Sequence, residues 1–229
     1  MTKRYSQERR VSTIQKRHRE KHTRGTQQEH ISGPSVVIEA GVLLNIESAW
    51  RDCAQAHLHR TLTAVSNAWS LPDRYGLSEE EAMAAMNHFE ARGFWARIEP
   101  YPEARNMLYA LDRMGASVWV MANVAEAYGP ELNLSLGGMV APQRILSMGL
   151  RATALERTTT LKRLTARAYL DIETRTLNAV VSVVPALACL HRGYSGIELP
   201  DAAVAVIDDM MDFPEMLSHW LKRPGSRVA

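Results

Sequence analysis

Cysteine is scarce in this sequence of 229 residues, and aromatic side chains make up only 7% of it. Cys53 and Cys189 are too few and too far apart for a disulfide framework or a zinc knuckle, so a cytoplasmic location is the default expectation. No apolar run approaches the roughly 18 residues that a membrane-spanning helix needs. The longest run, 179–190, is interrupted by Ser182 and Pro185. We therefore expect no membrane anchor, and the charged N-terminus predicts no secretory signal.

The formal charge of +2 is unevenly distributed along the chain. Residues 1–32 hold nine basic and three acidic side chains, a net +6, whereas the other residues hold 18 basic and 22 acidic ones, a net −4. The first segment has too few large apolar residues to offset the entropy cost of ordering its backbone. It is expected to be a flexible arm, residues 1–33, that binds nucleic acid or an acidic protein. A solubilising tail is the alternative. The predicted polyanion-binding residues are Arg9, Arg10, Lys16, Arg17, Arg19, Lys21 and Arg24.

Beyond Gly33-Pro34 the composition changes to that of a folded domain in which strands alternate with helices. Such alternation predicts a parallel sheet with helices on both faces. Ligands bind at the carboxyl ends of such strands, where Gly41, Asn123 and Asp171 should converge. The pair Asp208-Asp209 is predicted to be a helix start or a surface turn. Strands are predicted over 35–44, 117–122, 168–172 and 186–191, and helices over 48–68, 78–91, 102–114, 155–166, 174–183 and 212–222.

Four segments occur in a recognisable order: VVIEAGVLLN (36–45), PYPEARNMLYALDRMGASVWVMAN (100–123), TTTLKRL, which contains Lys162, and AYLDIETRTLNAVVSVVP (168–185). Together they resemble the motifs of the haloacid dehalogenase-like (HAD) superfamily, mostly phosphatases and phosphotransferases. The resemblance implies an α/β fold, a Rossmann-like three-layer HAD fold with a parallel sheet and a small helical cap inserted after the first strand. It divides residues 34–229 into a core (34–47 and 99–229) and a cap (48–98).

The family's chemistry requires residues that this sequence lacks. The resemblance implies a nucleophilic aspartate, a second aspartate that protonates the leaving group, and Mg²⁺. Alignment on Gly41 puts Ile38 and Ala40 at those two positions, and the first aspartate of the chain is Asp52. Glu39 is one residue out of register, so its side chain should point to the opposite face of the strand.

The family's other motifs are also incomplete. Ala122 replaces a hydroxyl residue that would bind phosphate, and Ile172 replaces the second of two paired acids. Asp171 is therefore the one weak metal candidate. Gly41, Asn123 and Lys162 are expected to form a residual phosphate-binding site. The crevice is predicted to be lined by Ile38, Ala40, Ala122 and Ile172.

Two hypotheses follow from these residues. The first is a catalytically inactive HAD-like binding or structural protein with a basic arm, which needs no cofactor and has no catalytic residue. The second is a divergent Mg²⁺-dependent phosphohydrolase or nucleotidase that uses Glu39 or Asp171 in an altered geometry.

Overall fold

A computed structural model describes residues 33–194 and 198–222, and all structural statements below concern these residues. The seven basic residues predicted to bind a polyanion lie outside them.

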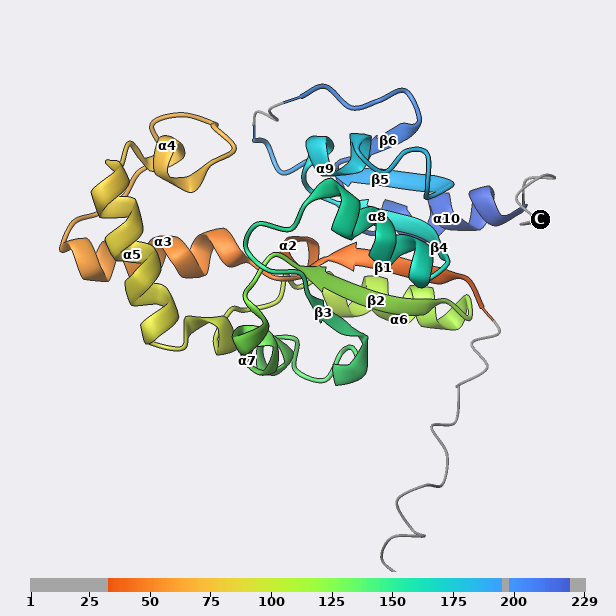
Figure 1. Cartoon of the computed structure of the whole chain (residues 1–229), viewed down its shortest axis with the longest axis horizontal. Coiled ribbons are helices and arrows are strands. Elements are labelled where there is room, and N and C mark those ends of the chain that lie inside the picture. The colour runs from red at the N-terminus through yellow and green to blue at the C-terminus, as the bar shows by residue number, and fades with distance from the viewer. Residues whose placement is uncertain (1–32, 195–197, 223–229) are drawn as a thin grey trace, which may run out of the picture. The chain divides into compact units, whose positions relative to one another are not determined.

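A parallel sheet of six strands, in the order β3-β2-β1-β4-β5-β6, forms the centre of the fold (Figure 1). β1 lies between β2 and β4, so the carboxyl ends of these three strands are neighbours. The strand order changes direction between β1 and β4, which is where α/β sheets place their ligands. The strands are β1 (Ser35–Glu39), β2 (Ser117–Ala122), β3 (Ile145–Ser147), β4 (Ala166–Asp171), β5 (Ala186–Leu190) and β6 (Val204–Ile207).

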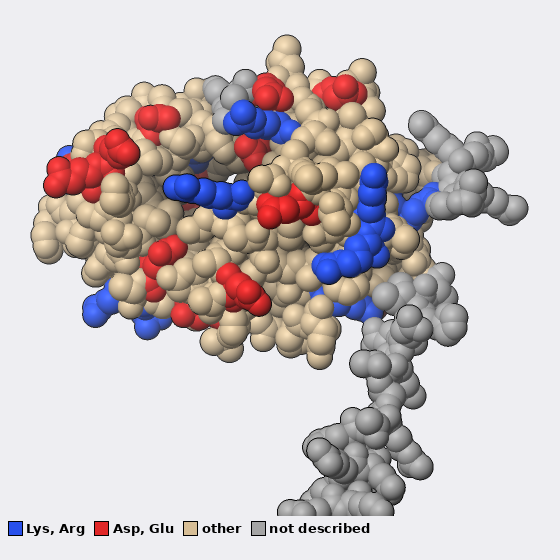
Figure 2. Space-filling model, in the orientation of Figure 1, with Lys and Arg blue, Asp and Glu red and all other residues tan. Residues whose placement is uncertain are grey.

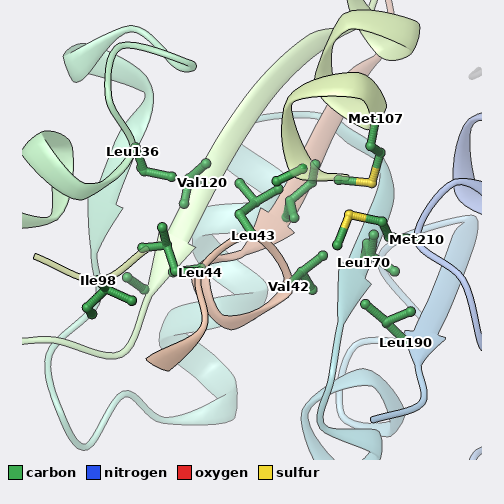
Figure 3. Packing of buried hydrophobic residues seen from close by; sticks show 14 of the residues in the cluster. Val42, Leu43, Leu44, Ile98, Met107, Val120, Leu136, Leu170, Leu190 and Met210 are labelled. Carbon is green, nitrogen blue, oxygen red and sulfur yellow. The ribbon is translucent and has the colours of Figure 1, made fainter. Parts of the chain in front are cut away.

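Both faces of the sheet are buried, which explains why its strands are rich in apolar residues. Val36 and Ile38 of β1 pack into one hydrophobic cluster, part of which is shown in Figure 3. Val37 packs into a second cluster on the other face, together with Tyr169 of β4. Because successive strand residues alternate between faces, Glu39 follows Val37 onto the second face.

Helices cover both faces. Helices α6 and α10 pack on the face of the first cluster, and α8 and α9 pack on the face of the second. The helices are α2 (Ala40–Leu43), α3 (Ile46–Leu58), α4 (Leu71–Tyr75), α5 (Glu79–Ala91), α6 (Ala104–Arg113), α7 (Gly129–Ser135), α8 (Ala154–Arg163), α9 (Thr174–Asn178) and α10 (Asp212–Lys222), with short 3₁₀ turns η1 (Phe94–Ala96), η2 (Glu126–Tyr128) and η3 (Pro142–Arg144). Among the residues described, no helix has the length and apolar character needed to cross a membrane.

Residues 46–98, here called the helical insert, extend from the sheet between β1 and α6 (Figure 1). The chain enters and leaves the insert side by side, since Leu44 and Pro100 form an antiparallel bridge. Aromatic residues form much of its core: Phe89 stacks on Phe94 at 5.3 Å between ring centroids and meets the edge of Trp95 at 5.1 Å. These rings therefore form a small aromatic core within the insert.

Most predicted elements are present, and the differences are informative. The strand predicted over 35–44 ends at Glu39, because the chain turns directly into α2. The strands β3 and β6 were not predicted, although Asp208-Asp209 does lie in the turn between β6 and α10. The helix predicted over 48–68 ends at Leu58, where His59 adopts the left-handed conformation with φ 52°.

Candidate ligand-binding site

A cavity of about 440 Å³ lies where the carboxyl ends of the central strands meet the helical insert. This volume is in the range of small-molecule binding sites. Basic and acidic side chains are interspersed over the molecular face seen in Figure 2, without a large area of one sign. The cavity is lined by Glu39, Gly41, Leu44, Ile46, Glu47, Trp69, Ser70, Leu71, Arg74, Met86, Tyr101, Asn123, Asp171, Ile172, Glu173, Arg192 and Tyr194.

Glu39 is the carboxylate that β1 contributes to this cavity. It is the last residue of the strand and is only 8% exposed. Its Oε2 accepts a hydrogen bond of 2.5 Å from the backbone N–H of Gly41 and so caps α2. The prediction that Ile38 and Ala40 stand in the crevice while Glu39 points away is wrong. Because α2 begins directly after the strand, the last strand residue faces the cavity, and Ile38 is fully buried in the first cluster.

The lining predicted from the sequence was thus more apolar than the observed one. Of its four predicted lining residues, only Ile172 lines the cavity, whereas Ala122 is buried in the first cluster. Gly41 does line it, and its backbone approaches two side chains closely. A Cβ on this residue would lie 2.8 Å from Oε2 of Glu39 and 3.0 Å from Cδ1 of Ile172.

Asp171, at the end of β4, is the second carboxylate of the cavity floor and is 2% exposed. The hydroxyl of Tyr169 donates a hydrogen bond to its Oδ2. Its Oδ1 accepts hydrogen bonds from the backbone N–H groups of Ile172, at 2.7 Å, and Glu173, at 3.0 Å. Both oxygens therefore have partners inside the protein.

Burial changes the protonation of both floor carboxyls. It raises the pKa of Glu39 to about 8, reinforced by the nearby charge of Asp171, while the Gly41 N–H and Arg157 oppose the shift. Burial also raises the pKa of Asp171 to about 6, although the Tyr169 hydroxyl, the Glu173 N–H and Arg157 favour its ionised form. Burial thus disfavours ionisation of both carboxyls, and of Glu39 more than of Asp171.

Arg157 of α8 is the buried cation beneath this floor, and the sequence reasoning missed it. Its guanidinium donates a hydrogen bond to Oδ1 of Asn123, which lines the cavity as predicted. Lys162, chosen from the motif, is exposed in the last turn of α8 and does not line the cavity, so its predicted place in the site is wrong. Helical spacing could have identified Arg157, because it lies one turn before the buried Leu161 and therefore shares its inward face.

On the side of the insert, Glu47 is held by three partners. Arg74 forms an ion pair of 2.7 Å with its Oε1, and the Tyr75 hydroxyl donates to the same oxygen at 2.8 Å. The Tyr194 hydroxyl donates to its Oε2. Burial favours the neutral form of Glu47, but the hydrogen bonds from these three residues outweigh it and lower its pKa.

Two arginines of the cavity stack on tyrosines. Arg74 lies 3.5 Å from the ring centroid of Tyr194, and Arg192 lies 3.8 Å from that of Tyr101. Arg192 follows β5 and donates one hydrogen bond of 3.0 Å, to the carbonyl of Val42. Neither arginine, nor Tyr194, belongs to a motif that the sequence analysis recognised.

Glu39 and Asp171 are the two floor carboxyls that could contact a cation. Mg²⁺ prefers several ionised oxygen ligands in octahedral geometry. Burial raises the pKa of Glu39 to about 8, and both Asp171 oxygens accept internal hydrogen bonds. Within the described ranges, no group of three or more His, Cys, Asp or Glu side chains is arranged to hold a metal ion.

Solved structures of similar architecture identify the fold. One is an L-2-haloacid dehalogenase from Xanthobacter autotrophicus with chloropropionic acid covalently bound, which has a TM-score of 0.54 and 12% identity over 81% of this chain and 98% of its own. This chain has the haloacid dehalogenase-like fold. A predicted phosphoglycolate phosphatase from Haemophilus somnus has a TM-score of 0.55 and 14% identity over 84% of this chain and 100% of its own.

A third HAD-like neighbour is a hydrolase from Deinococcus radiodurans with bound phosphate and sodium. It has a TM-score of 0.52 and 13% identity over 82% of this chain and 96% of its own. No family model matches the sequence, and no curated protein is similar to it. The fold predicted from the sequence is therefore confirmed at the level of architecture.

Proposed function

We propose that this HAD-like domain is a binding module that takes a small organic ligand into the cavity beneath the helical insert and does not catalyse Mg²⁺-dependent phosphoryl transfer. The observation that carries this proposal is the state of the two floor carboxyls. A phosphoryl acceptor must be ionised and free to attack. Glu39 is buried and bonded to the Gly41 N–H, its pKa is raised to about 8, and Asp171 has partners on both oxygens.

The composition of the cavity supports ligand binding. Leu44, Ile46, Leu71 and Met86 provide an apolar surface, and a few arginines, tyrosines and carboxyls provide polar contacts. Apolar walls with a small number of placed polar groups are typical of small-molecule sites.

The binding part of the proposal can be tested with a pair of matched variants. Met86 lines the cavity, whereas Met83 on the same helix is 56% exposed and does not. A panel of small organic acids, amides and amines is measured by ligand-observed NMR against the full chain. Probes that bind should be lost with Met86→Trp, which fills the cavity, and retained with Met83→Trp. Equal binding by both variants would show that the binding site lies outside this cavity.

The activity part is tested with p-nitrophenyl phosphate and nucleotides in the presence of Mg²⁺. We expect no release of phosphate above the protein-free background. Turnover that either Glu39→Gln or Asp171→Asn abolishes would overturn the proposal.

The second candidate function is a divergent Mg²⁺-dependent HAD phosphohydrolase or nucleotidase. One observation favours it: Glu39 and Asp171 line the same cavity, which the sequence analysis did not expect. The phosphatase assay above distinguishes this candidate from a binding module.

The basic arm belongs to the proposal as a contact for nucleic acid or an acidic protein. Its support is the concentration of positive charge in residues 1–32 of the sequence, against a mildly acidic remainder.

A further inference from the structure

Two arginines, Arg74 and Arg192, line the cavity and a third, Arg157, lies near its floor; the three differ in how their charges are balanced. Arg74 is paired with Glu47 at 2.7 Å. Arg157, beneath the floor, acts electrostatically on both Glu39 and Asp171 and favours their ionised forms. Arg192 has no carboxylate partner among the residues that the structure describes. Its only hydrogen bond there goes to the carbonyl of Val42, at 3.0 Å.

The guanidinium of Arg192 also has an unused donor. Its Nε–H is buried and has no hydrogen-bond partner within the described part of the chain. A buried donor of this kind costs free energy unless a partner reaches it. The stacking of Arg192 on Tyr101, with 3.8 Å to the ring centroid, holds the planar group in one orientation. Because that donor is enclosed, a ligand in the cavity would meet the other N–H groups of this fixed, planar guanidinium, which suit the oxygens of a carboxylate.

The remaining acidic groups restrict the kind of anion. Asp171 and Glu173 both line the cavity floor, so an anion that reached the floor would lie beside acidic side chains. A phosphate dianion would have only Arg192 to neutralise its two charges, and it would be repelled by these acids. A carboxylate carries one charge, and its apolar body can lie against Leu71 and Met86, away from the floor.

Resting on the proposed function, we infer that the ligand is a monocarboxylic acid with an apolar body, whose carboxylate pairs with Arg192 and which is held without being cleaved. The apolar lining is extensive enough to cover a body the size of a phenyl ring, since cavities of this volume enclose most of such a ligand.

The experiment compares 3-phenylpropanoate with 3-phenylpropanamide and phenyl phosphate by isothermal titration calorimetry on the full chain. We expect the carboxylate to bind at least about tenfold more tightly than the amide and the phosphate, as for a charge-assisted hydrogen bond. Arg192→Gln should abolish this preference while retaining the affinity for the amide. Arg192→Lys should retain part of it, because the charge remains and the planar fork is lost. The matched control Arg151→Gln, at an exposed arginine outside the cavity, should change nothing.

The outcomes separate this inference from the proposed function. Equal affinity for the carboxylate and the amide, a preference for phenyl phosphate, or a preference that survives Arg192→Gln would overturn the role of Arg192. None of these results would affect the proposal that the cavity binds a ligand, which Met86→Trp tests. Thermal unfolding of each Arg192 variant shows whether it is folded, and Arg192→Lys tests the inference if Arg192→Gln does not fold.

Discussion

The guanidinium of Arg157 donates a hydrogen bond to Oδ1 of Asn123 beneath two buried carboxyls. Arg157 is 6% exposed, and it favours the ionised forms of both Glu39 and Asp171. One buried cation therefore orients the amide of the cavity floor and limits how far burial raises the pKa of the two acids.

This relationship predicts unequal effects for two basic residues of α8. Arg157→Met leaves Asp171 without its compensating charge and Asn123 without a donor, so the free energy of unfolding should fall by about 3 kcal/mol. Lys162→Met, at the exposed position chosen from the motif, should change it by less than about 0.5 kcal/mol. Urea unfolding at pH 7 measures both. Similar losses for the two variants would contradict the placement of Arg157.

The protonation of Glu39 predicts how stability depends on pH. Its pKa is about 8 in the folded protein against an ordinary value of 4.5, so the folded state favours the neutral form. The stability that Glu39 contributes is then full below pH 4.5 and is lost as pH rises toward about 8. Over this range the free energy of unfolding should decrease by up to about 1.4 kcal/mol per pH unit.

The measurement compares the wild type with Glu39→Gln from pH 6.5 to 8, above the pKa of about 6 of Asp171. Glu39→Gln should remove most of the decline, because its amide does not ionise. The control, Glu80→Gln at an exposed glutamate, should retain the wild-type slope. If Glu39→Gln retains it as well, Glu39 is not a buried neutral acid.

The sequence was sufficient for the architecture because fully buried parallel strands are continuous apolar runs. SVWVMA (117–122) is such a run and matches β2 at both ends. VAVI (204–207) is equally apolar but has four residues, and Val206 at the edge of the sheet is 54% exposed, so its pattern does not distinguish a strand from a loop.

The site was harder to predict than the fold because its contacts are tertiary. The orientation of Glu39 was predicted wrongly because the motif was aligned on Gly41. The residue at which β1 ends determines which side chain faces the cavity. Arg74, Arg192 and Tyr194 come from the insert and from the segment after β5, and only the fold brings them to one cavity. No local spacing in the sequence indicates that Tyr194 reaches Glu47, which is 147 residues away.

The close approach at Gly41 gives a third prediction. A methyl group there would meet Oε2 of Glu39 at 2.8 Å and Cδ1 of Ile172 at 3.0 Å, so Gly41→Ala should lower the free energy of unfolding by about 2 kcal/mol. In a Glu39→Ala background the nearer contact is absent, and the same substitution should cost at least about 0.5 kcal/mol less. Denaturant midpoints of the four proteins in this double-mutant cycle give the coupling. Additive effects would show that the crowding does not involve Glu39.

The basic arm gives a prediction that depends on the sequence alone. If the seven basic residues between Arg9 and Arg24 bind phosphates, the affinity for a 20-base-pair DNA duplex should fall steeply with salt, by a log–log slope of roughly 0.9 per phosphate contacted. Replacing all seven with glutamine in the full chain should weaken binding and flatten this slope, as measured by fluorescence anisotropy between 50 and 200 mM salt. Replacing Lys162, Arg163 and Arg175 with glutamine on the folded domain is the control and should leave the slope unchanged. If the seven-residue variant retains both the affinity and the slope, the arm does not bind polyanions and the interpretation of its charge is wrong.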